Sequence, residues 1–478
     1  MPRTKIVATL GPASSDAETI RKLLFAGMDV ARINCSHGSH AQIRALVETI
    51  REVAQGIGKE PAILGDLQGP KLRLGEVPHG GKYLSLGTRL VLTPTPASEE
   101  EIAFPHEELY AAIQPGARLV IGDGEIELLV MERHGTRLEC VTTVEGLLES
   151  RKGVNLPRTA LPIDSITEKD KEDARLLCEL GVDYIAMSFV RSAQDIVDLQ
   201  GLLEQLGHSI PVIAKIEKAE AIDALLQIRE VADGVMVARG DLGLDLPPQE
   251  VPLLQKRIIA VCNQVGKPVI TATQMLQSMV EHPRPTRAEA TDVANAILDG
   301  TDAVMLSAET ASGKFPVESV LMMRNIAEIT ETQFPFELWD QRRREEFQQG
   351  GNVTQAISSA VCIVAARLGA RAIVTETVSG YTARQVARHR PKTPVIAVSP
   401  RVETHRRLAL VWGVQSVTVP NFDSTDAMVV ETVRAVSSLG LKTGDRIVIT
   451  AGIPFGSNGP TNLINVHEVV DGDLARRA

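Results

Sequence analysis

The chain has 478 residues, which at roughly 150 residues per domain predicts about three domains. It carries 50 Lys and Arg against 60 Asp and Glu, so the formal net charge is −10, and 44 % of the residues are hydrophobic. This composition excludes a disordered chain, a collagen and a small disulfide-stapled scaffold. It also weighs against nucleic acid or an anionic membrane as a partner, because both repel an acidic body.

The cysteines and the N-terminal segment bear on the compartment. Five cysteines stand far apart with no CxxC pair, which predicts neither a zinc site nor a disulfide framework and favours a reducing compartment. MPRTKIVATL lacks the apolar stretch of a signal peptide, and no apolar window reaches the roughly 18–20 residues that span a bilayer. We therefore expect a soluble, cytoplasmic protein.

Short apolar runs recur along the chain, each bounded by Gly, Pro or Asp and followed by an amphipathic helical pattern. Continuous Val and Ile, rather than alternation, indicate strands buried on both faces. The runs are 4–10, 28–34, 61–66, 182–188, 211–216, 233–238, 268–273 and 302–307. Eight such units in series predict a (β/α)8 TIM barrel.

The remaining segments predict two further domains. The stretch 70–159 holds short alternating runs and turn residues, which predict an inserted all-β domain, because a structureless loop of that length is improbable. The barrel then comprises 1–69 and 160–335. A polar, Gly-terminated stretch, ETQFPFELWDQRRREEFQQGG, is interpreted as a link to a C-terminal open α/β domain over 350–478.

Polar residues follow the predicted barrel strands, where the active sites of barrel enzymes lie. Each alone is more often a solvated or paired strand-end charge, but their convergence on one rim favours a site. They are Arg32, Asn34, Ser36, His37, Asp66, Gln68, Lys71, Arg73, Ser188, Arg191, Lys215, Glu217, Arg239, Asp241, Thr273, Ser307 and Glu309.

Two neighbouring strands each supply a cation beside an anion. Lys215 and Glu217 share a strand face, and Arg239 and Asp241 follow the next strand. Carboxylates from adjacent strands suit a hard divalent ion, although internal salt bridges are the alternative. Surplus cations nearby, Lys152 among them, favour a phosphorylated ligand and phosphoryl transfer. The chain has neither a GxxxxGK[ST] motif nor a GxGxxG motif opening a βαβ unit, so a nucleotide would bind by another arrangement.

At these residues the sequence resembles the pyruvate kinase family. The resemblance runs from end to end through TKIVATLGPAS, ARINCSHG, GDLQGPKLRLG, KGVNLP, IAKIEKAEAI, MVARGDLG, ATQMLQSM, RPTRAEATDVANAILDG and LSAET. It implies a TIM barrel, a β-barrel-like lid inserted after the third strand and a C-terminal regulatory α/β domain. The implied glycolytic reaction is phosphoryl transfer from phosphoenolpyruvate to ADP, followed by protonation of the enolate, giving pyruvate and ATP.

The resemblance also implies roles for individual residues. Glu217 and Asp241 would hold Mg²⁺ or Mn²⁺, and Lys215 would neutralise the phosphoryl group in transit. Arg32, Arg73 and Lys152 would meet phosphate oxygens, and Pro12 and His37 would flank the nucleotide. The substrate would be met by Lys215, by Gly240 and Asp241 through helix N-terminal amides, by Thr273 beside the carbon that is protonated, and by Ser307.

Two departures from the family pattern stand out. Lys71 replaces the Glu of potassium-dependent members, next to the monovalent-cation positions Asn34, Ser36 and Asp66. A tethered ammonium in that place predicts activity without potassium. Cys35 stands where Phe is usual, which we interpret as a packing substitution.

The C-terminal domain contains TVSGYTAR, which resembles an effector-phosphate loop and points to Thr377, Ser379, Gly380 and Thr382. An ordinary helix-capping turn is the alternative. FGSNGPTN (455–462) would close over the phosphate, and fructose bisphosphate, ribose phosphate, glucose phosphate and AMP are equally compatible. The resemblance implies a homotetramer.

Two other functions are compatible with a barrel of this kind. A metal-dependent lyase acting on pyruvate enolates needs neither the inserted domain nor Lys152. A catalytically dead sugar-phosphate sensor would be expected to lack Lys215, Glu217, Asp241 or Thr273, and all four are present.

Overall fold

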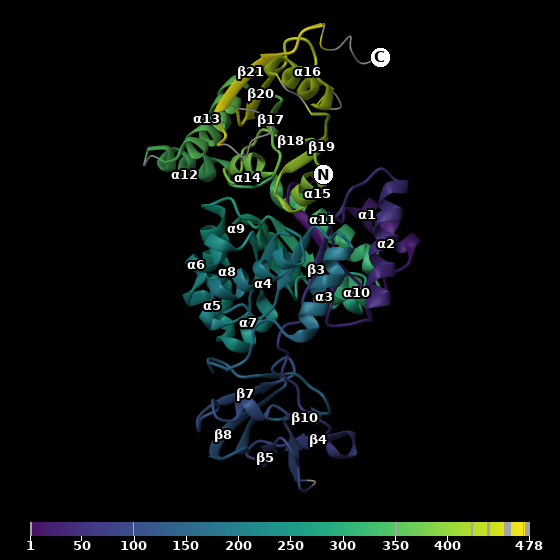
Figure 1. The fold of residues 1–478 in the computed structure, drawn as a ribbon, viewed down its shortest axis with the longest axis vertical. Coiled ribbons are helices and arrows are strands. Elements are labelled where there is room, and N and C mark those ends of the chain that lie inside the picture. Colours follow the sequence, from purple (N-terminus) through teal and green to yellow (C-terminus); the bar gives the residue numbers. More distant parts are fainter. Residues whose placement is uncertain are drawn as a thin grey trace.

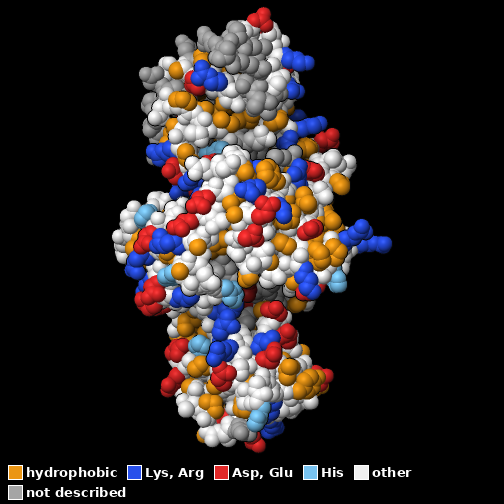
Figure 2. Space-filling model, turned by 90° about the vertical axis from the view of Figure 1, so that its right-hand side faces the viewer, with side chains coloured by type: hydrophobic (Ala, Val, Ile, Leu, Met, Phe, Trp, Pro, Cys, Tyr) orange, Lys and Arg blue, Asp and Glu red, His pale blue; other side chains and the backbone are white. Residues whose placement is uncertain are grey.

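The computed structural model describes residues 2–98, 100–348, 351–421, 424–436, 440–453, 460–471 and 473. Three bodies lie in a row: an all-β domain at one end, the barrel in the middle and an α/β domain at the other end (Figure 1). In the space-filling view a narrow neck connects the β domain to the barrel, and side chains of both charges lie along it (Figure 2).

Within the described residues, parallel strands close into an eight-stranded barrel in the order β1-β16-β15-β14-β13-β12-β3-β2. Every predicted run contains one of these strands, so the predicted fold class is confirmed. Their side chains are buried on both faces: Ile213 packs inside the barrel, and Val212 packs against the surrounding helices. The strands are β1 (Lys5–Leu10), β2 (Val30–Asn34), β3 (Ala62–Asp66), β12 (Tyr184–Met187), β13 (Val212–Ile216), β14 (Gly234–Ala238), β15 (Val269–Ala272) and β16 (Ala303–Leu306).

Helices surround the barrel, and several of them begin at strong caps. Ser39 with Gln42, and Thr286 with Glu289, form reciprocal capping boxes. At Gly65 an added Cβ would lie 2.5 Å from Leu177, so this glycine allows α3 to pack closely. The helices are α1 (Ala17–Ala26), α2 (His40–Gly56), α3 (Glu168–Glu179), α4 (Ala193–Gln205), α5 (Ala219–Asp223), α6 (Leu225–Val231), α7 (Arg239–Asp245), α8 (Val251–Asn263), α9 (Arg287–Asp299), α10 (Ala308–Ala311) and α11 (Pro316–Glu331).

The inserted domain is built of strands, as predicted. In its described part, a six-stranded sheet in the order β11-β7-β8-β9-β5-β6 lies beside the pair β10-β4 around a core that includes Phe104 and Leu128. The strands are β4 (Gly81–Leu84), β5 (Arg89–Thr93), β6 (Glu101–Ala103), β7 (Arg118–Ile121), β8 (Ile126–His134), β9 (Arg137–Val144), β10 (Gly146–Glu149) and β11 (Val154–Asn155).

The C-terminal domain carries the described sheet β19-β18-β17-β20-β21, in which only β21 runs antiparallel to its neighbour. The elements are α13 (Val353–Leu368), β17 (Ala372–Glu376), α14 (Tyr381–Ala387), β18 (Val395–Ser399), α15 (Val402–Arg407), β19 (Val414–Thr418), α16 (Thr425–Val436), β20 (Arg446–Ala451) and β21 (Leu463–Glu468). The predicted link contains a helix, α12 (Phe336–Gln348), whose Trp339 packs with Phe334 and Trp412. No helix in the described residues combines the length and apolarity needed to cross a membrane.

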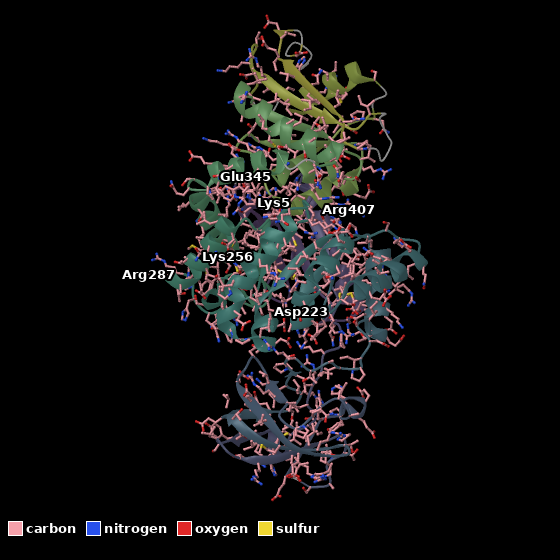
Figure 3. All side chains as sticks on the ribbon, turned by 90° about the vertical axis from the view of Figure 1, so that its left-hand side faces the viewer. Lys5, Asp223, Lys256, Arg287, Glu345 and Arg407 are labelled. Atoms are coloured by element: carbon pink, nitrogen blue, oxygen red, sulfur yellow. The ribbon has the colours of Figure 1, made fainter. Side chains whose placement is uncertain are left out.

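Buried ion pairs attach the C-terminal domain to the face of the barrel opposite the β domain. Asp302 accepts a hydrogen bond from Arg390 at 3.0 Å, and Asp183 accepts one from Arg406 at 2.8 Å. Figure 3 shows Lys5 and Arg407 at this junction, where the Lys5 ammonium donates to the Val414 carbonyl at 2.8 Å. The β domain and the C-terminal domain therefore contact opposite ends of the barrel strands.

Candidate active site at the barrel rim

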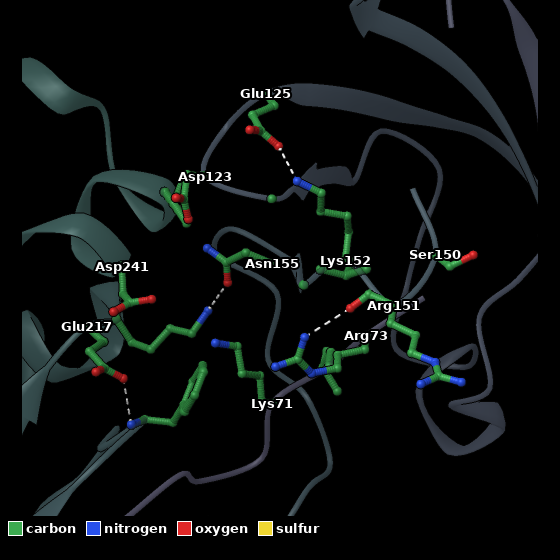
Figure 4. Close-up of a pocket in the computed structure, with 17 residues that line it drawn as sticks. Lys71, Arg73, Asp123, Glu125, Ser150, Arg151, Lys152, Asn155, Glu217 and Asp241 are labelled. Atoms are coloured by element: carbon green, nitrogen blue, oxygen red, sulfur yellow. Dashed lines mark hydrogen bonds and ion pairs between the residues drawn. The ribbon is translucent and has the colours of Figure 1, made fainter. Parts of the chain in front are cut away.

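Two cavities in the described residues are lined by eight of the seventeen predicted rim residues. One, of about 280 Å³, lies between the β domain and the barrel and is lined in part by Lys71, Arg73, Lys152, Glu217 and Asp241 (Figure 4). The other, of about 930 Å³, is lined in part by Pro12, Arg32, Asn34, His37 and Ser307. The predicted nucleotide-binding residues are therefore divided between the two cavities.

A chain of buried ion pairs joins residues of the two cavities. Arg32 donates from Nε to Asp66 at 2.7 Å, and it also donates to the Thr9 hydroxyl at 2.9 Å. The Lys215 ammonium lies 3.3 Å from Asp66 and 2.8 Å from Glu217, and it donates to the Ser188 hydroxyl at 2.7 Å. β3 and β13, which lie on either side of β12, supply Asp66 and Lys215, so the converging ends of the barrel strands bring these groups together.

The opposite charges in this row of ion pairs keep one another ionised. Burial alone would lower the pKa of Lys215, but the Asp66 and Glu217 carboxylates outweigh burial and raise it. Burial likewise opposes ionisation of Asp66, whereas Lys215 and Arg32 bring its pKa below the ordinary value. Lys215 is therefore a fixed positive charge in a site shielded from water.

Glu217 and Asp241 fit a divalent cation. Burial raises the pKa of Glu217, Lys215 opposes that effect, and the Asp241 charge adds to it. The backbone N–H of Phe189 donates to Glu217 at 2.9 Å and orients the carboxylate, and both carboxylates face the same cavity (Figure 4). A divalent ion would relieve this excess negative charge. The described residues contain no group of three or more His, Cys, Asp or Glu arranged around a metal, so substrate oxygens and water would supply the other ligands.

Thr273 is held in a strained backbone next to α7. Its φ is +68°, a left-handed conformation that costs a non-glycine residue energy. Its hydroxyl accepts from the Gly240 N–H at 2.8 Å, and the Arg239 guanidinium donates to the Thr273 carbonyl at 2.8 Å. Arg239 in turn pairs with Asp292 at 2.6 Å. These bonds hold Thr273 beside Gly240, the residue before Asp241.

Two further predicted cations, Lys152 and Arg73, have partners from the β domain. Lys152 lies 3.0 Å from Glu125 and 3.2 Å from Glu149, and Arg73 donates to the Arg151 carbonyl at 3.0 Å. These pairs are exposed enough to exchange for a phosphate. On the other side, the Ser36 N–H donates to the Asn34 side chain at 3.0 Å, and the buried Glu309 accepts from the N–H of Ser307 at 2.7 Å.

Comparison with known proteins decides the family. The family described as "Pyruvate kinase, barrel domain" matches residues 1–320, and "Pyruvate kinase, alpha/beta domain" matches residues 355–467. The chain is 47 % identical to pyruvate kinase 2 of Synechocystis sp., over 99 % of this chain and 80 % of that protein. It is 46 % identical to the pyruvate kinase of Geobacillus stearothermophilus, over 98 % and 81 %, and 44 % identical to that of Staphylococcus aureus, over 98 % and 81 %. The chain belongs to the pyruvate kinase family.

The loop that resembles an effector site of the pyruvate kinase family lies in the C-terminal domain, away from the rim. Ser379 lines a cavity of about 390 Å³ together with Arg384, Arg407 and Tyr184, the last of which begins a barrel strand. The Thr382 hydroxyl is buried and bonds that of Thr461 at 2.9 Å, while Thr377 and Gly380 flank Ser379 on the same loop. In FGSNGPTN, residues 455–459 lie outside the described residues.

Our prediction for this member of the pyruvate kinase family missed residues that line the β-domain cavity. Lys218 donates to Asn155 at 2.6 Å, and Phe189 holds Glu217. Two of these residues lie inside motifs already noted: Lys218 follows Glu217 in IAKIEKAEAI, and Asn155 is in KGVNLP. Their pairing was not predicted because Lys218 and Asn155 are 63 residues apart in the chain.

Proposed function

We propose that this chain, a member of the pyruvate kinase family, transfers the phosphoryl group of phosphoenolpyruvate to ADP and then protonates the resulting enolate to pyruvate. The observation that carries the proposal is the Lys215 ammonium, which is buried between Asp66 and Glu217 at the rim. A fixed cation in a shielded site stabilises negative charge on a group in transit without reorganising, which is the main contribution to phosphoryl transfer. Lys215, Glu217, Asp241 and Thr273 are all retained, which argues against a dead sensor.

Other residues at the rim bind the metal, bind the substrate carboxylate and organise the protonation step. Mg²⁺ or Mn²⁺, when held by Glu217 and Asp241, would supply positive charge to the phosphate and carboxylate oxygens of the substrate. Gly240 and Asp241, in the first turn of α7, would present backbone amides to the substrate carboxylate, for which the Gly240 N–H exchanges its present bond to Thr273, and Ser307 adds a hydroxyl. The Thr273 hydroxyl, already bonded to Gly240, organises protonation of the enolate carbon.

Cations and the two cavities position the nucleotide. Arg32, Arg73 and Lys152 bind phosphate oxygens, and Arg73 and Lys152 exchange their present partners to do so. Pro12 and His37 line the larger cavity with Arg32 and flank the nucleotide there. Closure of the β domain over the rim would exclude water from the transfer.

The activity is tested by Lys215→Met in a coupled assay of pyruvate formation from phosphoenolpyruvate, ADP and Mg²⁺. The wild type is expected to form pyruvate, and Lys215→Met to lower kcat by about 10²–10³-fold, because the fixed charge is lost. Lys171→Met on the exposed face of α3 serves as the control and should keep the wild-type rate. An inactive wild type, or a Lys215→Met variant at full rate, contradicts the mechanism.

We further propose that the reaction needs no potassium, because Lys71 stands where potassium-dependent members of the family have Glu and its ammonium supplies the charge of the monovalent ion. Lys71 lines the β-domain cavity with Arg73, and Asn34 and Asp66 are paired at the ends of neighbouring strands. Initial rates in potassium-free tetramethylammonium chloride and in KCl of equal ionic strength should agree within about twofold. Lys71→Glu should make the rate depend on KCl. Strong stimulation of the wild type by potassium would disprove this role of Lys71.

The finer regulatory and cellular proposals have separate support. Ser379 and the neighbouring Thr377, Gly380 and Thr382 are proposed to bind a phosphorylated effector, because Ser379 lines a cavity with two arginines.

Five buried free cysteines support a cytoplasmic location. A homotetramer is proposed by family resemblance, with neither nucleic acid nor membrane as a partner.

A further inference from the structure

Lys218, which follows Glu217 directly, contacts groups from three parts of the molecule. Its ammonium donates to the Asn155 side-chain oxygen at 2.6 Å and to Asp245 at 2.9 Å. It also lies 5.9 Å from the centre of the Phe189 ring. The side chains of Lys218 and Asp245 are only 13 % and 1 % exposed, so these contacts are made in a largely dry environment.

These contacts connect the β domain to both metal-binding carboxylates. Asn155 belongs to β11 of the β domain, and its bond with Lys218 is drawn as a dashed line in Figure 4. Asp245 is the last residue of α7, whose first turn holds Asp241, and it also accepts from the N–H of Ala219 at 2.8 Å. Glu217 precedes Lys218 in the chain and is oriented by the Phe189 N–H.

The positive charge of Lys218 is paired with a carboxylate of the protein, that of Asp245. Since Asp245 neutralises it at close range, Lys218 has less positive charge to offer a phosphate than Arg73, which donates to a backbone carbonyl. The Asn155 bond, by contrast, forms only while β11 lies against the rim. The arrangement therefore fits a residue that senses the position of the β domain.

We propose that Lys218 is a positioning residue that couples closure of the β domain, through Asn155, to the placement of Glu217 and Asp241 for the divalent cation. This proposal rests on the proposed function and deepens it. Lys218 holds the start of α5 against the end of α7 through Asp245, and its bond to Asn155 ties this junction to the β domain. The two carboxylates are then presented to one cavity.

The variant Asn155→Ala tests the coupling while leaving the Lys218–Asp245 pair intact. It is compared with Lys218→Met, with the double variant and with Thr143→Ala, a control in the β domain away from the cavity. Mn²⁺ binding is measured by electron paramagnetic resonance without substrates, and kcat and KM are measured alongside. A charge-assisted hydrogen bond supports an expected increase of about five- to tenfold in the Mn²⁺ dissociation constant of each single variant.

The double variant distinguishes loss of the Lys218–Asn155 bond from two independent structural effects on Mn²⁺ binding. The double variant should bind Mn²⁺ no more weakly than Lys218→Met, because both changes remove the same bond. Wild-type Mn²⁺ affinity in Asn155→Ala, effects that multiply in the double variant, or a wild type that binds no Mn²⁺ would each overturn the proposal. If Lys218→Met does not fold, Asn155→Ala decides alone. A wild type that binds Mn²⁺ but forms no pyruvate refutes the proposed function without affecting this test.

Discussion

Glu376, the last residue of β17, keeps its carboxyl group in a poorly hydrated place. It is 7 % exposed, and burial raises its pKa to about 7 from an ordinary value of 4.5. The folded state therefore binds a proton that the unfolded state releases between these two values. This contribution to stability is complete below about pH 4.5 and is lost as the pH rises through about 7.

Glu376→Gln should remove this pH dependence. The free energy of unfolding of the variant, relative to wild type, should increase by about 2–3 kcal/mol between pH 4.5 and pH 8, because the wild type must then bury a charge. Urea unfolding at a series of pH values measures the difference, with Glu403→Gln on exposed α15 as the control. A difference that stays constant with pH would show that the pKa of Glu376 is the same in the folded and the unfolded state.

At the scale of elements, predictability depends on where the stabilising contacts lie. The barrel strands could be predicted because each run of Val and Ile is itself buried on both faces. The polar sequence of helix α12 indicates only a link. Its stability comes from Trp339, which packs in one cluster with Phe334 and with Trp412 from the middle of the C-terminal domain. β21 is not predicted from the sequence because it has no continuous apolar run, and its residues are partly buried or exposed at a sheet edge.

The candidate site follows the same rule. Lys215, Glu217 and Asp241 could be predicted, since strand ends in a barrel converge whatever the intervening sequence. Lys218 and Asn155 could not, because their contact depends on how the β domain lies against the rim. The same dependence explains why Arg73 and Lys152 share one cavity while Arg32 and His37 share the other.

At the scale of the whole molecule, any effector bound at Ser379 acts from the end of the barrel opposite the β domain (Figure 1). The intervening contacts are directional and at least partly buried: Arg390 to Asp302, Arg406 to Asp183, and the Tyr184 hydroxyl to the Arg407 carbonyl at 2.7 Å. Tyr184 begins β12, and Ser188, just beyond the end of that strand, receives the Lys215 hydrogen bond. A change in the Ser379 cavity thus has a path of packed groups to the rim.

Ser379→Ala should remove the response to the effector and leave the reaction itself intact. Rate curves against phosphoenolpyruvate are measured with fructose bisphosphate, ribose phosphate, glucose phosphate and AMP in turn. For at least one of them, the half-saturating phosphoenolpyruvate concentration of the wild type should shift by about fivefold or more, the lower range of ordinary allosteric coupling. Ser379→Ala should lose that shift at unchanged kcat, because Ser379 lies in the C-terminal domain, and Thr443→Ala in the same domain should retain it. If no compound shifts the wild-type curve, or if Ser379→Ala responds as the wild type does, the loop does not bind an effector.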